Sequence, residues 1–158
     1  MTTIFRKQVS DYLLFQKGYL VAAAAIGFGR LGLSLAGLQD STVAWLSMSA
    51  VALAATLYYG VSVHTRRFGS YPQLLPLVFF QVALTHAIAV LGILIAIAGL
   101  PNVFAAPEFS GPVPDPNPWH HVLAHLTIGM VVPTLLLWGI SSVVLLVTKK
   151  VARRTAMA

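Results

Sequence analysis

The sequence contains no cysteine and very little charge. The absence of cysteine excludes disulfides, thiol nucleophiles and cysteine-ligated zinc or iron–sulfur sites. Only 9% of the 158 residues are charged, against about 25% in ordinary soluble domains. Hydrophobic residues make up 58% of the chain. This composition excludes an ordinary soluble globule and predicts an all-α membrane protein.

Acidic residues are the scarcest charges, with four Asp and Glu against ten Lys and Arg. No acid lies within an apolar run, and no nucleophile stands beside a candidate base, so hydrolytic or phosphoryl-transfer chemistry has no expected site. The sequence therefore favours a function other than catalysis. The net charge of +6 does not indicate nucleic-acid binding, because the basic residues gather beside the ends of the apolar runs.

Four apolar runs predict one transmembrane domain over residues 1–158, an antiparallel four-helix bundle. Every basic residue except Arg30 lies on one side of these runs, and the last of them form a cytoplasmic basic tail at 148–158. The positive-inside rule then places both termini in the cytoplasm, in a bacterial-type inner membrane with the lipid bilayer as the main partner. The predicted spans are about 18–38, 43–63, 74–100 and 119–147.

The outer loop between the third and fourth spans is rich in proline. From Pro101 to Pro118 it holds six of the nine prolines, so neither a helix nor a central strand is expected there. The loop also carries Glu108 and Asp115, which are half of the acidic residues. An extended, polyproline-like segment over the mouth of the bundle is predicted.

Small residues form a stripe along the first span. The segment from Gly27 to Gly32 matches G-x-G-x-x-G, but it lies inside an apolar helix and not between a strand and a helix, so no dinucleotide site is expected. Small residues allow neighbouring helix backbones to approach closely, and the second span is the expected partner. The predicted packing residues are Ala25, Gly29, Gly32 and Ala36.

Arg30 is the most costly residue within the spans, since a charge in hydrocarbon costs about 2.5 kcal/mol or more. Its distance from Asp40 brings it within reach of the outer surface by snorkelling. One interpretation pairs Arg30 with Glu108 or Asp40. The alternative is an anion or headgroup site between helices.

The third span carries Gln81, Thr85 and His86 near its middle. Gln81 and Thr85 share a helix face because they are four residues apart. A neutral imidazole within a bundle is satisfied by one hydrogen bond, so His86 is either a structural residue or a ligand or proton-relay residue. These three side chains and Arg30 form the candidate intramembrane polar site.

Three histidines, His120, His121 and His125, begin the fourth span. His121 and His125 project from one helix face, which suits a divalent metal with Glu108 as an oxygen ligand. Haem is the other cofactor considered. The number of residues between each histidine and the inner end of its span gives its depth in the membrane. The depths of His86 and His125 differ by roughly 15 Å on this count, so they are a poor axial pair for one haem.

Three functions remain open from the sequence. The leading hypothesis is an accessory or scaffold subunit of a membrane assembly, with a membrane-protein partner and no cofactor. The second is a small-solute carrier or channel that works as a homo-oligomer and is lined by Arg30, Gln81 and His86. The third is a redox protein associated with haem, a metal or a quinone, using His86 or the outer histidines.

Overall fold

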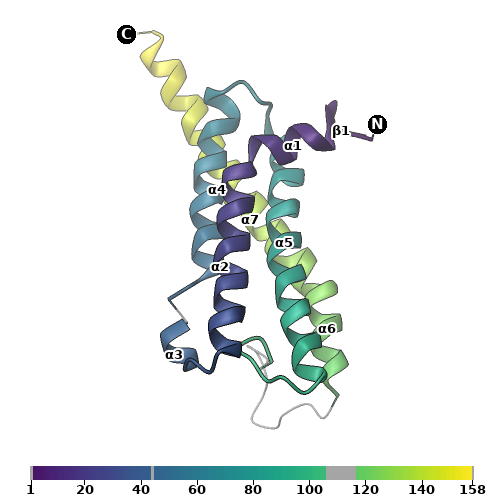
Figure 1. Cartoon of the computed structure of the whole chain (residues 1–158). Helices are drawn as coiled ribbons and strands as arrows, with labels where there is room; N and C mark the ends of the chain where they lie inside the picture. Colours follow the sequence, from purple (N-terminus) through teal and green to yellow (C-terminus); the bar gives the residue numbers. More distant parts are fainter. Residues whose placement is uncertain (1, 44, 106–116, 158) are drawn as a thin grey trace.

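The computed structural model describes residues 2–43, 45–105 and 117–157, without the side chain of Asp40. The chain is mostly helical (Figure 1). In chain order the elements are β1 (Thr3–Ile4), β2 (Lys7–Gln8), α1 (Val9–Phe15), α2 (Lys17–Leu35), α3 (Asp40–Val43), α4 (Met48–Thr65), α5 (Tyr71–Ile97), α6 (Pro118–Leu126) and α7 (Ile128–Thr155).

Four helical segments are long and apolar enough to cross a membrane, which confirms the predicted membrane class. The helices α2, α4, α5 and α7 lie side by side, and the two ends of the chain lie at the same end of the molecule (Figure 1). The observed bounds differ from the predicted ones by a few residues, except in the fourth span. The segments are Lys17–Leu35, Ser41–Thr65, Tyr71–Ile97 and Pro118–Thr155.

Capping residues set where two of the spanning helices begin. Ser47 precedes α4, and its hydroxyl accepts a hydrogen bond from the backbone N–H of Ala50 at 3.2 Å. Ser70 precedes α5 and forms a capping box with Gln73, whose side-chain oxygen accepts from the Ser70 N–H at 2.8 Å. Lys149 of α7 donates to the Ser70 hydroxyl at 3.0 Å, so the start of α5 is also tied to α7.

The N-terminal residues form a small hairpin and a short helix across the end of the bundle that carries both termini (Figure 1). Phe5 and Arg6 turn the chain with φ of 47° and 67°. The buried Tyr12 of α1 donates to the Ile4 carbonyl at 2.8 Å and holds the hairpin in place. Burial, with a smaller contribution from the charge of Asp11, raises the pKa of Tyr12.

One face of α2 is buried at steps of four residues, which is the spacing expected for a helix face that packs against its neighbours. Gly27 belongs to this face. A Cβ there would lie 2.6 Å from the sulfur of Met48 and 2.9 Å from a methyl of Ile88, so the glycine is needed for close packing of α2 on α4 and α5. The other buried residues are Tyr19, Ala23 and Leu31.

The predicted packing stripe of α2 lies on another face. Ala25, Gly32 and Ala36 are exposed and Gly29 is half-buried. No atom lies within 4 Å of a Cβ built at Gly29 or Gly32, so α4 does not cover this stripe as predicted. The face that turns inward is instead the one that carries Tyr19, Ala23, Gly27 and Leu31.

The fourth span consists of two helices, and the break is at Thr127, where φ is −116° and ψ is −91°. The sequence predicts a kink from Pro133, yet the chain breaks about one and a half turns earlier. The Thr127 hydroxyl donates to the Leu123 carbonyl at 2.6 Å and closes the end of α6. Helix α7 runs on past the predicted inner end of the span at 147 to Thr155, so most of the basic tail is helical.

The loop after α5 folds back onto the bundle. Asn102 donates to the Gly92 carbonyl at 2.8 Å, and the Ser34 hydroxyl accepts from the backbone N–H of Val103 at 2.8 Å. Phe104 fills the space beside Gly92, where a Cβ would lie 2.6 Å from its ring. The polyproline prediction and the two acids of the loop lie in 106–116, outside the described residues.

Candidate functional site

Helix α6 brings two histidines to one face at the end of the bundle opposite the chain termini (Figure 1). Asn117 caps the helix, its side-chain oxygen accepting from the Trp119 N–H at 3.1 Å, and Pro118 supplies a fixed φ in the first turn. His121 and His125 are one turn apart, and their Nε2 atoms are 3.1 Å apart. The ring centroids are 4.8 Å apart. The i, i+4 spacing thus produces the pair that the sequence predicts.

His86 of α5 extends this pair into a chain of three rings. Its Nδ1 lies 2.7 Å from the Nδ1 of His125, and the ring centroids are 4.9 Å apart. We call His121, His125 and His86 the histidine chain. All three side chains are half-buried. The chain begins on α6, at one end of the bundle, and ends near the middle of α5.

The contact between His86 and His125 overturns the predicted difference in their depths. That prediction took Val147 as the inner end of the fourth span. In the structure α7 continues past Val147, and the start of α5 is held against it by two contacts: the indole N–H of Trp138 donates to the Tyr71 carbonyl at 3.0 Å, and Lys149 donates to the Ser70 hydroxyl at 3.0 Å. His125 is about 20 Å along α6 and α7 from Trp138, and His86 is about 22 Å along α5 from Tyr71.

Gly129 makes room for His86. A Cβ at this position would lie 2.8 Å from Cε1 and 3.1 Å from Nδ1 of His86, and 3.0 Å from the Ala124 carbonyl oxygen. The sequence interpretation did not single out Gly129, because a glycine in an apolar helix carries no signal of what packs against it. Its position one turn after His125 was the available clue.

Gly129→Ala is expected to displace the His86 ring and break its contact with His125, because the added methyl group would overlap the imidazole. Nitrogen NMR of protein labelled at histidine should show shifted ring signals of His86 and His125, with His64 unchanged. Gly139→Ala is the control, since no atom lies within 4 Å of a Cβ there. Unchanged His86 signals in Gly129→Ala would contradict the assigned role of Gly129.

The geometry of the histidine chain is that of a hydrogen-bonded relay. His125 presents Nδ1 to one neighbour and Nε2 to the other, whereas a chelate needs one nitrogen from each residue aimed at a common point. Among the described residues no group of three or more histidines and carboxylates is arranged to hold a metal. The ligating nitrogens of two axial histidines on one haem iron would lie about 4 Å apart. The Nδ1 atoms of His86 and His125 are 2.7 Å apart.

The other predicted metal ligands do not join this chain in the contacts seen. His120 is exposed, and its Nε2 lies 3.5 Å from the side-chain nitrogen of Asn117. Glu108 lies outside the described residues. The structure therefore unites His121 and His125 with His86, which the sequence assigned to a separate site.

Gln81 and Thr85 precede His86 on α5 and occupy the bundle interior. Gln81 is fully buried, and neither atom of its side-chain amide has a hydrogen-bond partner within the protein. Its backbone carbonyl accepts from Thr85 at 3.1 Å and from the hydroxyl of Tyr19 at 3.5 Å. A buried amide without a partner costs about 1–3 kcal/mol, and native proteins usually compensate such a group with water or a ligand.

Arg30 packs against the outer loop. Its guanidinium carbon lies 5.4 Å from the centroid of the Phe104 ring, which is a cation–π contact. Its Nε is buried without a hydrogen-bond partner in the protein. The predicted ion pair with Glu108 or Asp40 falls on side chains that the structure does not describe. The sequence does not predict the Phe104 contact, because nothing in the spacing of the two residues shows that the loop folds back onto α2.

Comparisons of this chain with models of protein families, with curated proteins and with solved structures find no match. The function is therefore argued from the arrangement of the side chains.

Proposed function

We propose that this protein carries protons through an integral membrane bundle along the histidine chain. The proposal is the carrier or channel hypothesis with the proton as the transported solute. The single observation that carries the proposal is the position of His125, which contacts His86 through Nδ1 at 2.7 Å and His121 through Nε2 at 3.1 Å. A neutral imidazole has one N–H donor and one acceptor nitrogen, so histidine accepts a proton on one nitrogen and releases one from the other.

The relay needs no oxidant or other reactant. A proton binds Nδ1 of His121, and His121 passes its Nε2 proton to Nε2 of His125. His125 then passes its Nδ1 proton to Nδ1 of His86, which releases a proton from its other nitrogen. Each transfer forms one N–H bond and breaks one. Rotation of the rings then turns the N–H donors back to their starting direction along the chain.

Polar groups continue from His86 toward the other end of the bundle. Gln81 lies about one and a half turns further along α5 and keeps its buried amide without a protein partner. The hydroxyl of Tyr19 reaches the Gln81 carbonyl from α2. Water bound at these groups would extend the path beyond His86, since buried water typically bridges such unsatisfied polar atoms.

We also propose the orientation that this path requires, an antiparallel bundle with both termini in the cytoplasm. In support, the chain ends lie at one end of the molecule together with α1 and the basic end of α7 (Figure 1). The positive-inside rule assigns this end to the cytoplasm of a bacterial-type inner membrane. The histidine chain then opens toward the outer face.

The test is proton flux into liposomes that contain the purified protein and a trapped pH-sensitive dye. A potassium diffusion potential drives proton entry, and the rate is compared with that of protein-free liposomes of the same lipid. We expect a rate several times that of the protein-free liposomes, proportional to the amount of protein. Equal rates in both preparations would overturn the proposal.

The two other hypotheses stay predictions. No finding bears on a membrane assembly with a partner subunit or on a homo-oligomer. For a redox protein associated with haem, a metal or a quinone, the ring spacing in the histidine chain favours hydrogen bonding over ligation in the arrangement described here.

A further inference from the structure

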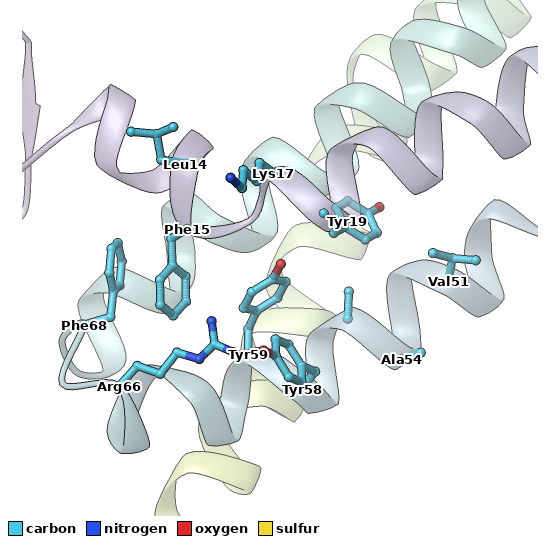
Figure 2. Close-up of a pocket in the computed structure, with 12 residues that line it drawn as sticks. Leu14, Phe15, Lys17, Tyr19, Val51, Ala54, Tyr58, Tyr59, Arg66 and Phe68 are labelled. Atoms are coloured by element: carbon cyan, nitrogen blue, oxygen red, sulfur yellow. Dashed lines mark hydrogen bonds between the residues drawn. The ribbon is translucent and has the colours of Figure 1, made fainter.

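An open groove of about 720 Å³ lies between the start of α2 and the last turns of α4, at the end of the bundle that carries the chain termini. Figure 2 shows its lining side chains, which come from the α1–α2 junction, from α4 and from the residues just after it. This volume is in the range of sites that hold small organic molecules. The groove shares no residue with the histidine chain, so ligand binding here is independent of proton transfer there.

Two basic side chains stand at one end of the groove, Lys17 at the start of α2 and Arg66 just after α4. Arg66 donates to the Tyr58 hydroxyl at 2.6 Å, and its guanidinium carbon lies 5.6 Å from the centroid of the Tyr58 ring. No acidic residue lines the groove, and among the described side chains neither cation forms an ion pair. This end of the groove therefore carries two positive charges that no carboxylate balances.

Aromatic rings build the wall beside these charges. Phe15 stacks on Phe68 with centroids 4.0 Å apart and lies 5.6 Å from Tyr59. Tyr19 and Tyr59 are both nearly fully buried, so the wall is anchored in the core. Aromatic rings with polar tips are typical of the boundary between the headgroups and the hydrocarbon.

The other end of the groove is apolar and continues along α4. Val51 and Ala54 lie there, several turns along α4 from Arg66 (Figure 2). A ligand that fits this arrangement has an anionic head and an apolar chain. Basic pockets between membrane helices near the cytoplasmic surface are known to bind anionic lipid headgroups.

We propose that this groove binds an anionic phospholipid from the adjacent leaflet, with its phosphate between Lys17 and Arg66 and one acyl chain along Val51 and Ala54. The charges give preference for an anionic headgroup over a zwitterionic one. The apolar part gives preference for a lipid over a free phosphate ion. Both preferences are testable on the full chain.

The headgroup test is a titration of the detergent-solubilised protein with dioleoylphosphatidylglycerol or dioleoylphosphatidylcholine, followed by native mass spectrometry. We expect Kd for phosphatidylglycerol to be lower by about fivefold or more, and the double variant Lys17→Gln/Arg66→Gln to raise that Kd by about tenfold. Arg153→Gln/Arg154→Gln removes the same charge from the end of α7 and should change Kd by less than about twofold. All four side chains are exposed, so folding is not at risk.

The acyl-chain test uses Ala54→Phe, which fills the apolar end, and Leu53→Phe, which adds a ring to an exposed neighbour outside the groove. Only Ala54→Phe should weaken lipid binding. Equal Kd for the two lipids, or equal losses in both double variants, would overturn the proposal. Competition by inorganic phosphate together with unchanged binding in Ala54→Phe would also overturn it, because the site would then be one for free phosphate.

Discussion

His125→Gln is expected to lower the proton flux through reconstituted protein at least about tenfold. His125 is the middle ring of the histidine chain and the residue that joins α6 to α5 within it. The amide of glutamine can hydrogen-bond to both neighbours, but it does not gain and lose protons near neutral pH. The substitution therefore preserves the hydrogen bonds to the neighbouring histidines but removes proton transfer through residue 125. The measurement is the dye signal in liposomes at a fixed diffusion potential.

His120→Gln is the matched control for this experiment. His120 lies on the same helix, is exposed, and contacts Asn117. Its substitution should leave the flux within about twofold of the unmodified protein. If His125→Gln retains full flux, the chain is not the path for protons. If both variants lose flux equally, the loss reflects damage to α6 and the assignment of the path to His125 fails.

Gly60→Ala is expected to destabilise the packing of α4 on α7. A Cβ at Gly60 would lie 2.7 Å from Cβ of Val144, 2.8 Å from its Cγ1 and 2.9 Å from the backbone oxygen of Ser141. Rotation of the Val144 side chain would relieve only the contact with Cγ1, because Cβ of Val144 and the Ser141 carbonyl move only with the backbone of α7. Helices α4 and α7 form the most extensive contact between two of the described elements. Forcing them apart should cost about 1–3 kcal/mol.

Thermal unfolding in detergent measures this effect, with Gly29→Ala as the control. Gly29 is also helical, and no atom lies within 4 Å of a Cβ there. Its substitution should leave the melting temperature unchanged or raise it, because alanine is favoured over glycine in helices by about 1 kcal/mol. A melting temperature of Gly60→Ala equal to that of Gly29→Ala would contradict the close approach of α4 and α7.

The membrane class and the number of candidate spans follow from local composition, and they could be predicted without a structure. A run of about 20 apolar residues has few alternatives to a membrane helix, since hydrocarbon forces backbone hydrogen bonds to be satisfied within the segment. The third span illustrates this: the predicted range is 74–100 and the observed helix is Tyr71–Ile97. The i, i+4 pairing of His121 and His125 is equally local, because it depends only on the helix period.

The contact of His86 with His125 depends instead on the relative height of two helices. The basic residues of the tail suggest an inner end near 147, but α7 continues to Thr155, and Trp138 and Lys149 both bond to the start of α5. Hydropathy predicts the length of an apolar helix but not its axial shift relative to a neighbouring helix. Side-chain contacts such as that of Trp138 with Tyr71 determine that shift.

The choice of which face turns inward also depends on the folded bundle. A helix such as α2 is apolar on every side, so hydropathy alone does not distinguish the face that packs from the face that meets lipid. Gly27 packs against Met48 and Ile88, while Gly29 faces open space two positions along the same helix. Composition thus suffices to assign the chain to a membrane. Packing between helices decides which glycines admit a neighbour and which histidines meet, since both depend on residues distant in the sequence.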